Sequence, residues 1–215
     1  MIEKATGLIL RTRPLTETSL IVLWLTAEFG RLATVAKGAR RAKSPFRGKL
    51  DLFYLADFSF SRSRTELHLL REVNVRETHS SLRQELGRLQ QAAYCAMLIE
   101  QTTETETPLP AIFELMTRVL GHLSACAPEP QTIFAFELKL LDELGLKPDL
   151  QQSKLNPGAR QLLKTLTECD WELLPRIRLS EAQEKELRQF LHGFLVFHLG
   201  RIPKGRNAAL EAGCA

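Results

Sequence analysis

The spacing of hydrophobic positions along the chain changes near residue 78. Before that point, short β-branched and leucine-rich runs are separated by turn residues, a pattern typical of strands. It predicts strands over residues 7–11, 20–26, 32–37, 52–60 and 67–75. So few strands leave costly open edges unless the sheet curls, and the pattern therefore favours a small closed barrel.

After residue 78 the hydrophobic period becomes helical. Ser81 with Gln84 suggests a capping box for a first helix, and Pro110 suggests the start of a second. A third helix is predicted over residues 133–144, and a last one from the Ser180–Gln183 box to Gly200. The inward stripe expected for the first helix is Leu82, Leu86, Leu89, Ala93 and Met97; for the second it is Ile112, Leu115, Met116, Val119 and Leu123; for the last it is Leu187, Phe190, Leu191, Phe194, Leu195 and His198.

These two patterns define the expected architecture. We predict an α+β multidomain chain, with an N-terminal five-stranded OB-type β-barrel over residues 1–77 and an all-helical domain over residues 78–215.

Charge is distributed unevenly between these two parts. The 215 residues carry 29 Lys or Arg and 25 Asp or Glu, a formal net charge of +4. Up to Val75 the count is 13 basic against 7 acidic residues (net +6), which leaves 16 against 18 (net −2) for the rest. Between Glu28 and Asp51 there are seven basic residues and no acidic one. This is either a solvated basic loop or a surface for a polyanion.

Several protein classes are excluded by composition. Apolar residues make up 44% of the chain and charged residues 25%, as in ordinary globular domains. The longest apolar run is the eight residues from Ala92 to Ile99, far short of the roughly 20 that a membrane span needs, so no membrane span is expected. The first 13 residues do not resemble a secretory signal. The four cysteines form no C-x-x-C pair, so we expect a reducing cytoplasm and no zinc site.

Catalytic motifs are not found. The sequence has no G-x-S-x-G, no phosphate-binding glycine loop and no H-E-x-x-H. One catalytic alternative is a carboxylate cluster that would hold magnesium for a nuclease. The candidates are Asp51, Asp57, Glu66 and Glu72. Strand alternation places Asp57, Glu66 and Glu72 opposite the apolar positions, where solvated charges belong. We therefore expect no catalytic residue.

The basic residues are better placed for function. Loops of an OB-type barrel flank a groove that binds oligonucleotides, and cations that reach phosphates give affinity without sequence selectivity. Phe46, inside the basic loop, is a candidate for stacking on a base or, alternatively, for packing in the core. The candidate DNA-binding residues are Arg11 and Arg13 in the first connection, Lys37, Arg40, Arg41, Lys43, Phe46, Arg47 and Lys49 in the third, and Arg62 and Arg64 in the last.

Four segments carry a resemblance to a known family. They are GLILRTRPLTETSLIV from residue 7, VAKGARRAKSPFRG from residue 35, FELKLLDELGLKPDL from residue 136 and HLGRIPKGR from residue 198. In this order they resemble the bacterial RecO family of DNA repair proteins. The resemblance implies an OB fold, a helical domain, and binding and annealing of single- and double-stranded DNA without covalent chemistry or cofactor.

The same resemblance implies partners and a cytoplasmic, nucleoid-associated location. The partners are RecR, the C-terminal tail of single-stranded DNA-binding protein and, indirectly, RecA, in RecF-pathway repair. Many RecO-like proteins carry a four-cysteine zinc module after the Pro-Asp-Leu segment. Here Leu150 is followed by Gln-Gln-Ser-Lys instead, so we expect a zinc-free variety. The alternative function is a protein-interaction adaptor whose basic loop pairs with acidic partners.

The partner tail is acidic and ends in an apolar residue with a free carboxylate, so its site needs an apolar pocket beside a cation. Resemblance places this site in the helical domain. One helix offers apolar residues near cations, although the same residues would equally serve as core; the candidates are Arg118, Phe134, Leu138, Lys139 and Leu141.

Overall fold

The structure is a computed structural model that describes residues 1–149 and 155–213. The chain forms two compact units. The first comprises residues 1–79 and 103–117, and the second comprises residues 80–102 and 118–215. The segment 103–117 thus groups with the strands, although it lies far beyond them in sequence. The expected domain boundary between residues 77 and 78 remains a prediction.

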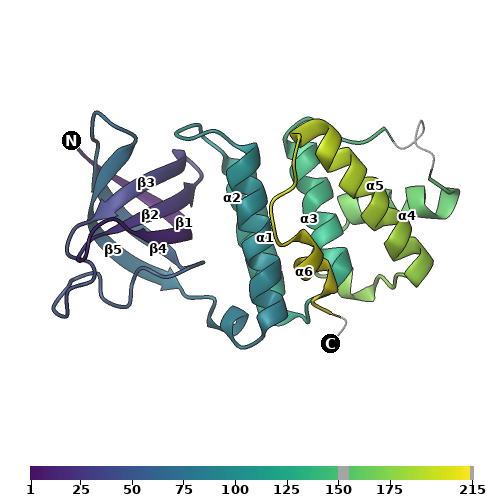
Figure 1. Cartoon of the computed structure of the whole chain (residues 1–215), viewed down its shortest axis with the longest axis horizontal. Helices are drawn as coiled ribbons and strands as arrows, with labels where there is room; N and C mark the ends of the chain where they lie inside the picture. Colours follow the sequence, from purple (N-terminus) through teal and green to yellow (C-terminus); the bar gives the residue numbers. More distant parts are fainter. Residues whose placement is uncertain (150–154, 214–215) are drawn as a thin grey trace. The chain divides into compact units, whose positions relative to one another are not determined.

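The first unit contains a closed five-stranded barrel, as the sequence predicted. Its strands are β1 (Ile2–Pro14), β2 (Leu20–Thr26), β3 (Gly30–Ala36), β4 (Leu55–Ser61) and β5 (Leu67–Glu77). They pair in the order β1-β2-β3-β5-β4 and close back onto β1 (Figure 1). Only β3 and β5 pair in parallel, and the other neighbours are antiparallel.

Strand β1 is longer than its hydrophobic run indicated. Residues 2–8 pair with β4, and residues 7–14 pair with β2. A register shift between Ile9 and Arg11 bends the strand, as β-bulges do, so one strand serves both neighbours. Arg11 and Arg13 therefore lie on β1 itself and not in the first connection, which corrects the sequence-based placement.

The barrel core is aromatic. The rings of Trp24 and Phe58 stack with centroids 4.0 Å apart, and Phe60 packs beside Phe58 at 5.7 Å. The buried indole N–H of Trp24 donates to Thr34 Oγ1 at 2.8 Å, so its polar edge is satisfied. Three residues of the predicted strand 52–60, Ala56, Phe58 and Phe60, point into this core, although β4 itself begins at Leu55 and not at residue 52.

The turn between β2 and β3 depends on Gly30. Its φ is +62°, and a Cβ placed there would lie 1.7 Å from Thr107 O. We expect Gly30→Ala to destabilise the barrel well beyond the roughly 1–2 kcal/mol that left-handed backbone alone costs. Gly48→Ala is the matched control, because Gly48 has φ +72° and nothing within 4 Å. Thermal unfolding of both variants checks this, and equal losses would contradict it.

The helices follow the strands. They are α1 (Leu86–Thr102), α2 (Pro110–Ala125), α3 (Pro130–Glu143), α4 (Pro157–Glu168), α5 (Glu181–Leu199) and α6 (Arg206–Glu211), with short 3-10 turns over Ser80–Arg83 and Leu174–Arg176. The Ser180–Gln183 capping box and the Gly200 stop of α5 are confirmed. Helix α4 was not predicted, although Asn156 caps it and Pro157 begins it.

The first helix departs from its prediction in start and face. Ser81 and Gln84 belong to a 3-10 turn instead of a capping box. Leu86 is 69% exposed and Met97 is 37% exposed, so the predicted stripe is wrong at these two positions, whereas Leu82 is buried as predicted. The buried face instead combines apolar residues such as Ala92 and Cys95 with Tyr94 and polar Gln91, and is rotated from the predicted stripe.

A buried ion pair explains that face. The guanidinium of Arg206 donates from Nε to Glu137 Oε1 at 2.7 Å and from Nη2 to Glu137 Oε2 at 2.8 Å. Tyr94 donates its hydroxyl to Glu137 Oε1 at 2.5 Å. These three residues come from α6, α3 and α1, and Figure 1 shows α6 lying between the other two helices. The cluster therefore fixes the short last helix in the second unit.

Candidate nucleic-acid interface

The basic loop, residues 37–54 between β3 and β4, is held in place by its backbone. It folds through successive tight turns, with Arg41 N–H donating to Gly38 O and Ser44 N–H to Arg41 O. Arg40 N–H donates to Thr18 O at 3.0 Å, and its guanidinium lies 3.4 Å from Thr16 O. The basic loop is thus attached to the β1–β2 connection, and two of the three predicted loops meet.

The cations of this surface point outward. Lys49 is half-buried and donates to Val73 O at 3.2 Å, and Arg47 lies 3.3 Å from Ala42 O. The remaining side chains are exposed along β1 and the basic loop, and the Arg40 guanidinium also lies near Thr16 O. We call this exposed set the basic surface: Arg11, Arg13, Lys37, Arg40, Arg41, Lys43 and Arg47. Such a surface suits phosphates, which each exposed cation can neutralise.

The third predicted loop does not join this surface. Arg62 forms ion pairs with Glu3 at 2.7 Å and with Glu106 at 3.3 Å, and lies over the ring of Phe29. The hydrogen bond to Glu3 raises the pKa of the Arg62 guanidinium. Phe29 belongs to the β2–β3 turn, at the opposite end of these strands from the basic loop. The Arg62 side chain is therefore already paired with carboxylates. Arg64 is exposed in the same β4–β5 turn.

Phe46 is a core residue. It is 7% exposed and packs in the barrel cluster with Trp24 and Phe58. The packing alternative for this residue is therefore the one that the structure supports, and only its small exposed part, which lines the pocket described below, is open to a ligand. Its burial anchors the middle of the basic loop, so the neighbouring cations project from a fixed backbone.

We expect Phe46→Leu to leave DNA affinity unchanged, because leucine keeps an apolar anchor in the loop. The free energy of unfolding should fall by about 1 kcal/mol, as for a nearly volume-conserving core change. Fluorescence anisotropy with a labelled oligonucleotide and thermal unfolding check both parts. A large affinity loss with an unchanged melting temperature would assign Phe46 to base stacking instead.

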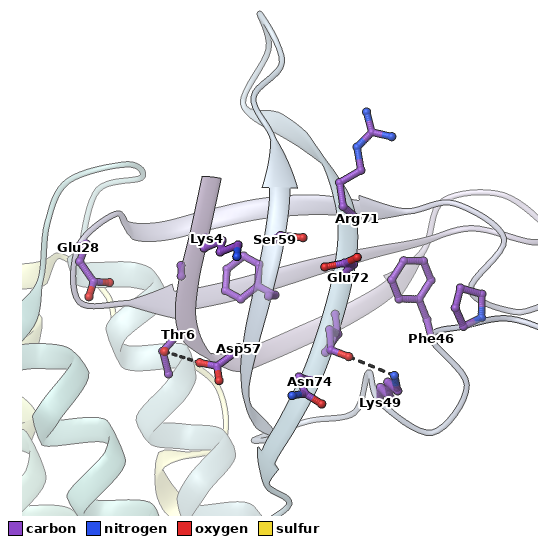
Figure 2. A pocket seen from close by; sticks show the side chains of 14 residues that line it. Lys4, Thr6, Glu28, Phe46, Lys49, Asp57, Ser59, Arg71, Glu72 and Asn74 are labelled. Carbon is purple, nitrogen blue, oxygen red and sulfur yellow. Dashed lines mark hydrogen bonds between the residues drawn. The ribbon is translucent and has the colours of Figure 1, made fainter. Parts of the chain in front are cut away.

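A shallow pocket of about 730 Å³ lies beside the basic loop on β1, β4 and β5 (Figure 2). Its charges are mixed, since Lys4 and Arg71 stand near Asp57 and Glu72. Thr6 donates to Asp57 Oδ1 at 2.6 Å, and Arg76 donates to Oδ2 at 2.7 Å. Both contacts lower the pKa of Asp57. This carboxylate is thus held by protein partners.

The carboxylates proposed for a nuclease do not assemble. Asp51, Glu66 and Glu72 are exposed on separate segments, and Asp57 is engaged as described. In the described part of the chain, no three His, Cys, Asp or Glu side chains come together as a metal site would require. The Gln151–Lys154 segment, where the zinc module is expected to be missing, lies outside the described residues.

The candidate tail-binding residues do not form an open pocket. Phe134, Leu138 and Leu141 are at most 2% exposed and belong to the core. Lys139 donates to Thr167 O at 2.7 Å and to Cys169 O at 2.8 Å, and burial lowers its pKa. Arg118 pairs with Asp170 at 3.2 Å. The structure therefore supports the core alternative for these apolar residues, because that helix face is buried.

The fold and the basic surface define a class of protein, in which a small OB-type barrel that presents cations is followed by helices. Comparison with known proteins identifies the family. Residues 1–79 match the family described as "Recombination protein O N terminal", and residues 83–154 and 152–207 match "Recombination protein O C terminal". The chain belongs to the recombination protein O (RecO) family of DNA repair and recombination proteins.

Individual relatives agree with this assignment. The chain is 33% identical to "DNA repair protein RecO" of Bacillus pumilus, over 96% of this chain and 93% of the relative. It is 35% identical to the protein of that name from Alkaliphilus metalliredigens, over 94% and 96%. It is 36% identical to that from Anaeromyxobacter dehalogenans, over 98% and 96%. Among the described helices, none is long and apolar enough to cross a membrane.

Proposed function

We propose that this chain is a DNA-binding recombination mediator. It binds single- and double-stranded DNA through the basic surface and anneals complementary strands. With RecR, it helps RecA replace single-stranded DNA-binding protein on DNA. It performs no covalent chemistry in this role.

One observation carries the proposal. Seven exposed cations lie along β1 and the basic loop, and the loop backbone is tied to the β1–β2 connection by Arg40. A fixed array of this kind neutralises a phosphate backbone without reading bases, as annealing of arbitrary sequences requires. Family membership supports the same role.

Fluorescence annealing of complementary oligonucleotides tests the proposal. Annealing should be faster with the protein than without it, both on bare strands and on strands covered by single-stranded DNA-binding protein. It should slow steeply with added salt. Binding of DNA without faster annealing would favour the adaptor alternative.

The proposed partner tail is assigned to the second unit as a whole. Arg118 and Lys139 both approach the end of α4, where Arg118 pairs with Asp170 and Lys139 donates to Cys169 O, so two cations from different helices meet there. A tail peptide carrying a photoreactive group should cross-link to residues of the second unit. Cross-links confined to β1–β5 would overturn the assignment.

A further inference from the structure

The last long helix carries an exposed aromatic stripe that the core does not use. Phe197 is 82% exposed, whereas Leu187, Leu191 and Leu195 of the same helix are fully buried. Phe190, Phe194 and Phe197 occupy positions i, i+4 and i+7, which place them on one side of the helix. We call Phe190, Phe194, Phe197 and His198 the α5 stripe.

Ring contacts order this stripe. The centroids of Phe190 and Phe194 are 6.0 Å apart, those of Phe194 and His198 are 4.3 Å apart, and Phe197 meets His198 edge-on at 5.0 Å. The rings therefore contact one another, while most of the Phe197 side chain stays exposed. From Phe190 to Phe197 the helix rises about 10 Å, the length of about three nucleotides at roughly 3.4 Å each.

A glycine leaves a gap within the stripe. Gly193 lies inside α5, three residues after Phe190 and four before Phe197, and is exposed. A Cβ placed there would have nothing within 4 Å, so internal packing does not require glycine. Glycine inside a helix is less stable than alanine. The position instead leaves a space beside Phe197 that has no side chain, open to a planar group from outside.

The segment that contains and follows this gap has a positive net charge. From Leu187 to Leu210 the sequence contains no Asp or Glu. Arg201 and Lys204 follow the helix and are exposed, and no ion pair found among the described residues engages either side chain. Aromatic rings beside unpaired cations are the combination that binds single-stranded nucleic acid.

Size argues against a second copy of the chain as the occupant. A phenylalanine buries roughly 150–250 Å², and Phe190 and Phe194 are already half-buried. The stripe therefore falls well short of the roughly 800 Å² that each partner contributes to a stable interface. A stacked base needs only one open ring face.

We propose that the α5 stripe is a second site for single-stranded nucleic acid, where a base stacks on Phe197 over Gly193 and Arg201 or Lys204 meets the phosphates. This inference rests on the proposed function, because it assigns to the second unit a contact with the same nucleic-acid strand that the basic surface binds. It adds a contact made by stacking to one made by charge.

Binding of the full chain to labelled oligo(dT) tests this site. A length of about 30 nucleotides exceeds the roughly 16 that one OB fold covers. Phe197→Ala should weaken binding roughly 5- to 150-fold at unchanged salt slope, because stacking releases no counterions. Arg201→Gln should instead lower that slope by about 0.7. In oligonucleotides containing 5-iododeoxyuridine, ultraviolet cross-links should map to the α5 stripe.

Gly193→Ala separates binding from stability. The added methyl group should fill the gap and weaken oligo(dT) binding several-fold, while the melting temperature stays equal or rises. Gly121→Ala is the matched control, since Gly121 is exposed within α2 and also has nothing within 4 Å. This control should gain the same stability and keep full affinity.

The outcomes distinguish failure of this site from failure of the proposed function. Unchanged oligo(dT) affinity in both Phe197→Ala and Gly193→Ala, with the basic-surface variants still impaired, overturns this site and leaves the proposed function intact. A change of sedimentation behaviour or of acidic-peptide binding in Phe197→Ala, without loss of oligo(dT) affinity, assigns the stripe to a protein partner and also overturns it. Failure of the unaltered protein to bind oligo(dT) overturns the proposed function itself.

Discussion

Arg206→Ala should lower the free energy of unfolding by about 3–5 kcal/mol, because it leaves the Glu137 carboxylate charged and buried without its partner. Glu137 is fully buried and Arg206 is 4% exposed. Burial alone would lower the pKa of Arg206, yet its hydrogen bonds to Glu137 raise that pKa above its usual value. Burial and the nearby carboxylate raise the pKa of Tyr94, so its hydroxyl stays a donor.

Denaturant unfolding followed by helix circular dichroism measures this loss. Arg178→Ala is the surface control, because Arg178 also pairs with a carboxylate, Glu129 at 3.1 Å, but is 79% exposed. It should cost no more than about 1 kcal/mol. Replacing the cluster with apolar residues, as Tyr94→Phe, Glu137→Leu and Arg206→Met together, should recover much of the loss. Equal losses for Arg206→Ala and Arg178→Ala would contradict the assigned role.

The barrel was predictable because strand alternation is local. Phe58 and Phe60 alternate with polar Asp57 and Ser59, and only one register buries both rings. The extension of β1 to Ile2 was not predictable from the same pattern. Residues 2–6 pair with β4, more than 50 positions away along the chain. Their side chains are exposed or half-buried, so this pairing leaves no hydrophobic pattern in the sequence.

The helical unit shows where sequence periodicity misleads. Its first helix buries Gln91 and Tyr94 through hydrogen bonds to distant partners and exposes Leu86. Most of its buried residues are apolar, but residues 92–99 are apolar throughout, so hydrophobicity alone does not single out the buried face there. For α5 the buried leucines were predicted correctly, and the flanking rings Phe190 and Phe194 were assigned to the core because apolar residues usually belong there.

The fold separates the candidate DNA-binding residues into cations that are exposed and cations that are paired with carboxylates. Sequence places Arg62 and Arg41 in similar basic turns, and only the fold brings Glu3 and Glu106 to Arg62. Net charge over a segment therefore overstates the cations available to phosphates. Most cations of the basic loop are exposed, as expected, and no carboxylate occurs between residues 29 and 50 to pair with them locally.

Replacing Arg40 and Arg41 with alanine should weaken DNA binding by similar factors on unrelated sequences. It should lower the salt slope on single strands by about 1.4, at roughly 0.7 for each lost phosphate contact. Loop geometry should survive, because Arg40 is tied to Thr18 through its backbone N–H, which alanine retains. Anisotropy titrations at several salt concentrations, on two sequences of equal length, give both quantities.

A charge-matched control separates local contacts from net charge. Lys164 and Arg176 are exposed cations of the second unit, and replacing both with alanine removes the same two charges from the chain. If only net charge mattered, this control would lose as much affinity and slope as the Arg40 and Arg41 variant. We expect it to change the slope by much less, because a counterion is released only where a cation meets a phosphate. Equal slopes in the two variants would remove the basic surface from the mechanism and leave the DNA contact to other parts of the chain.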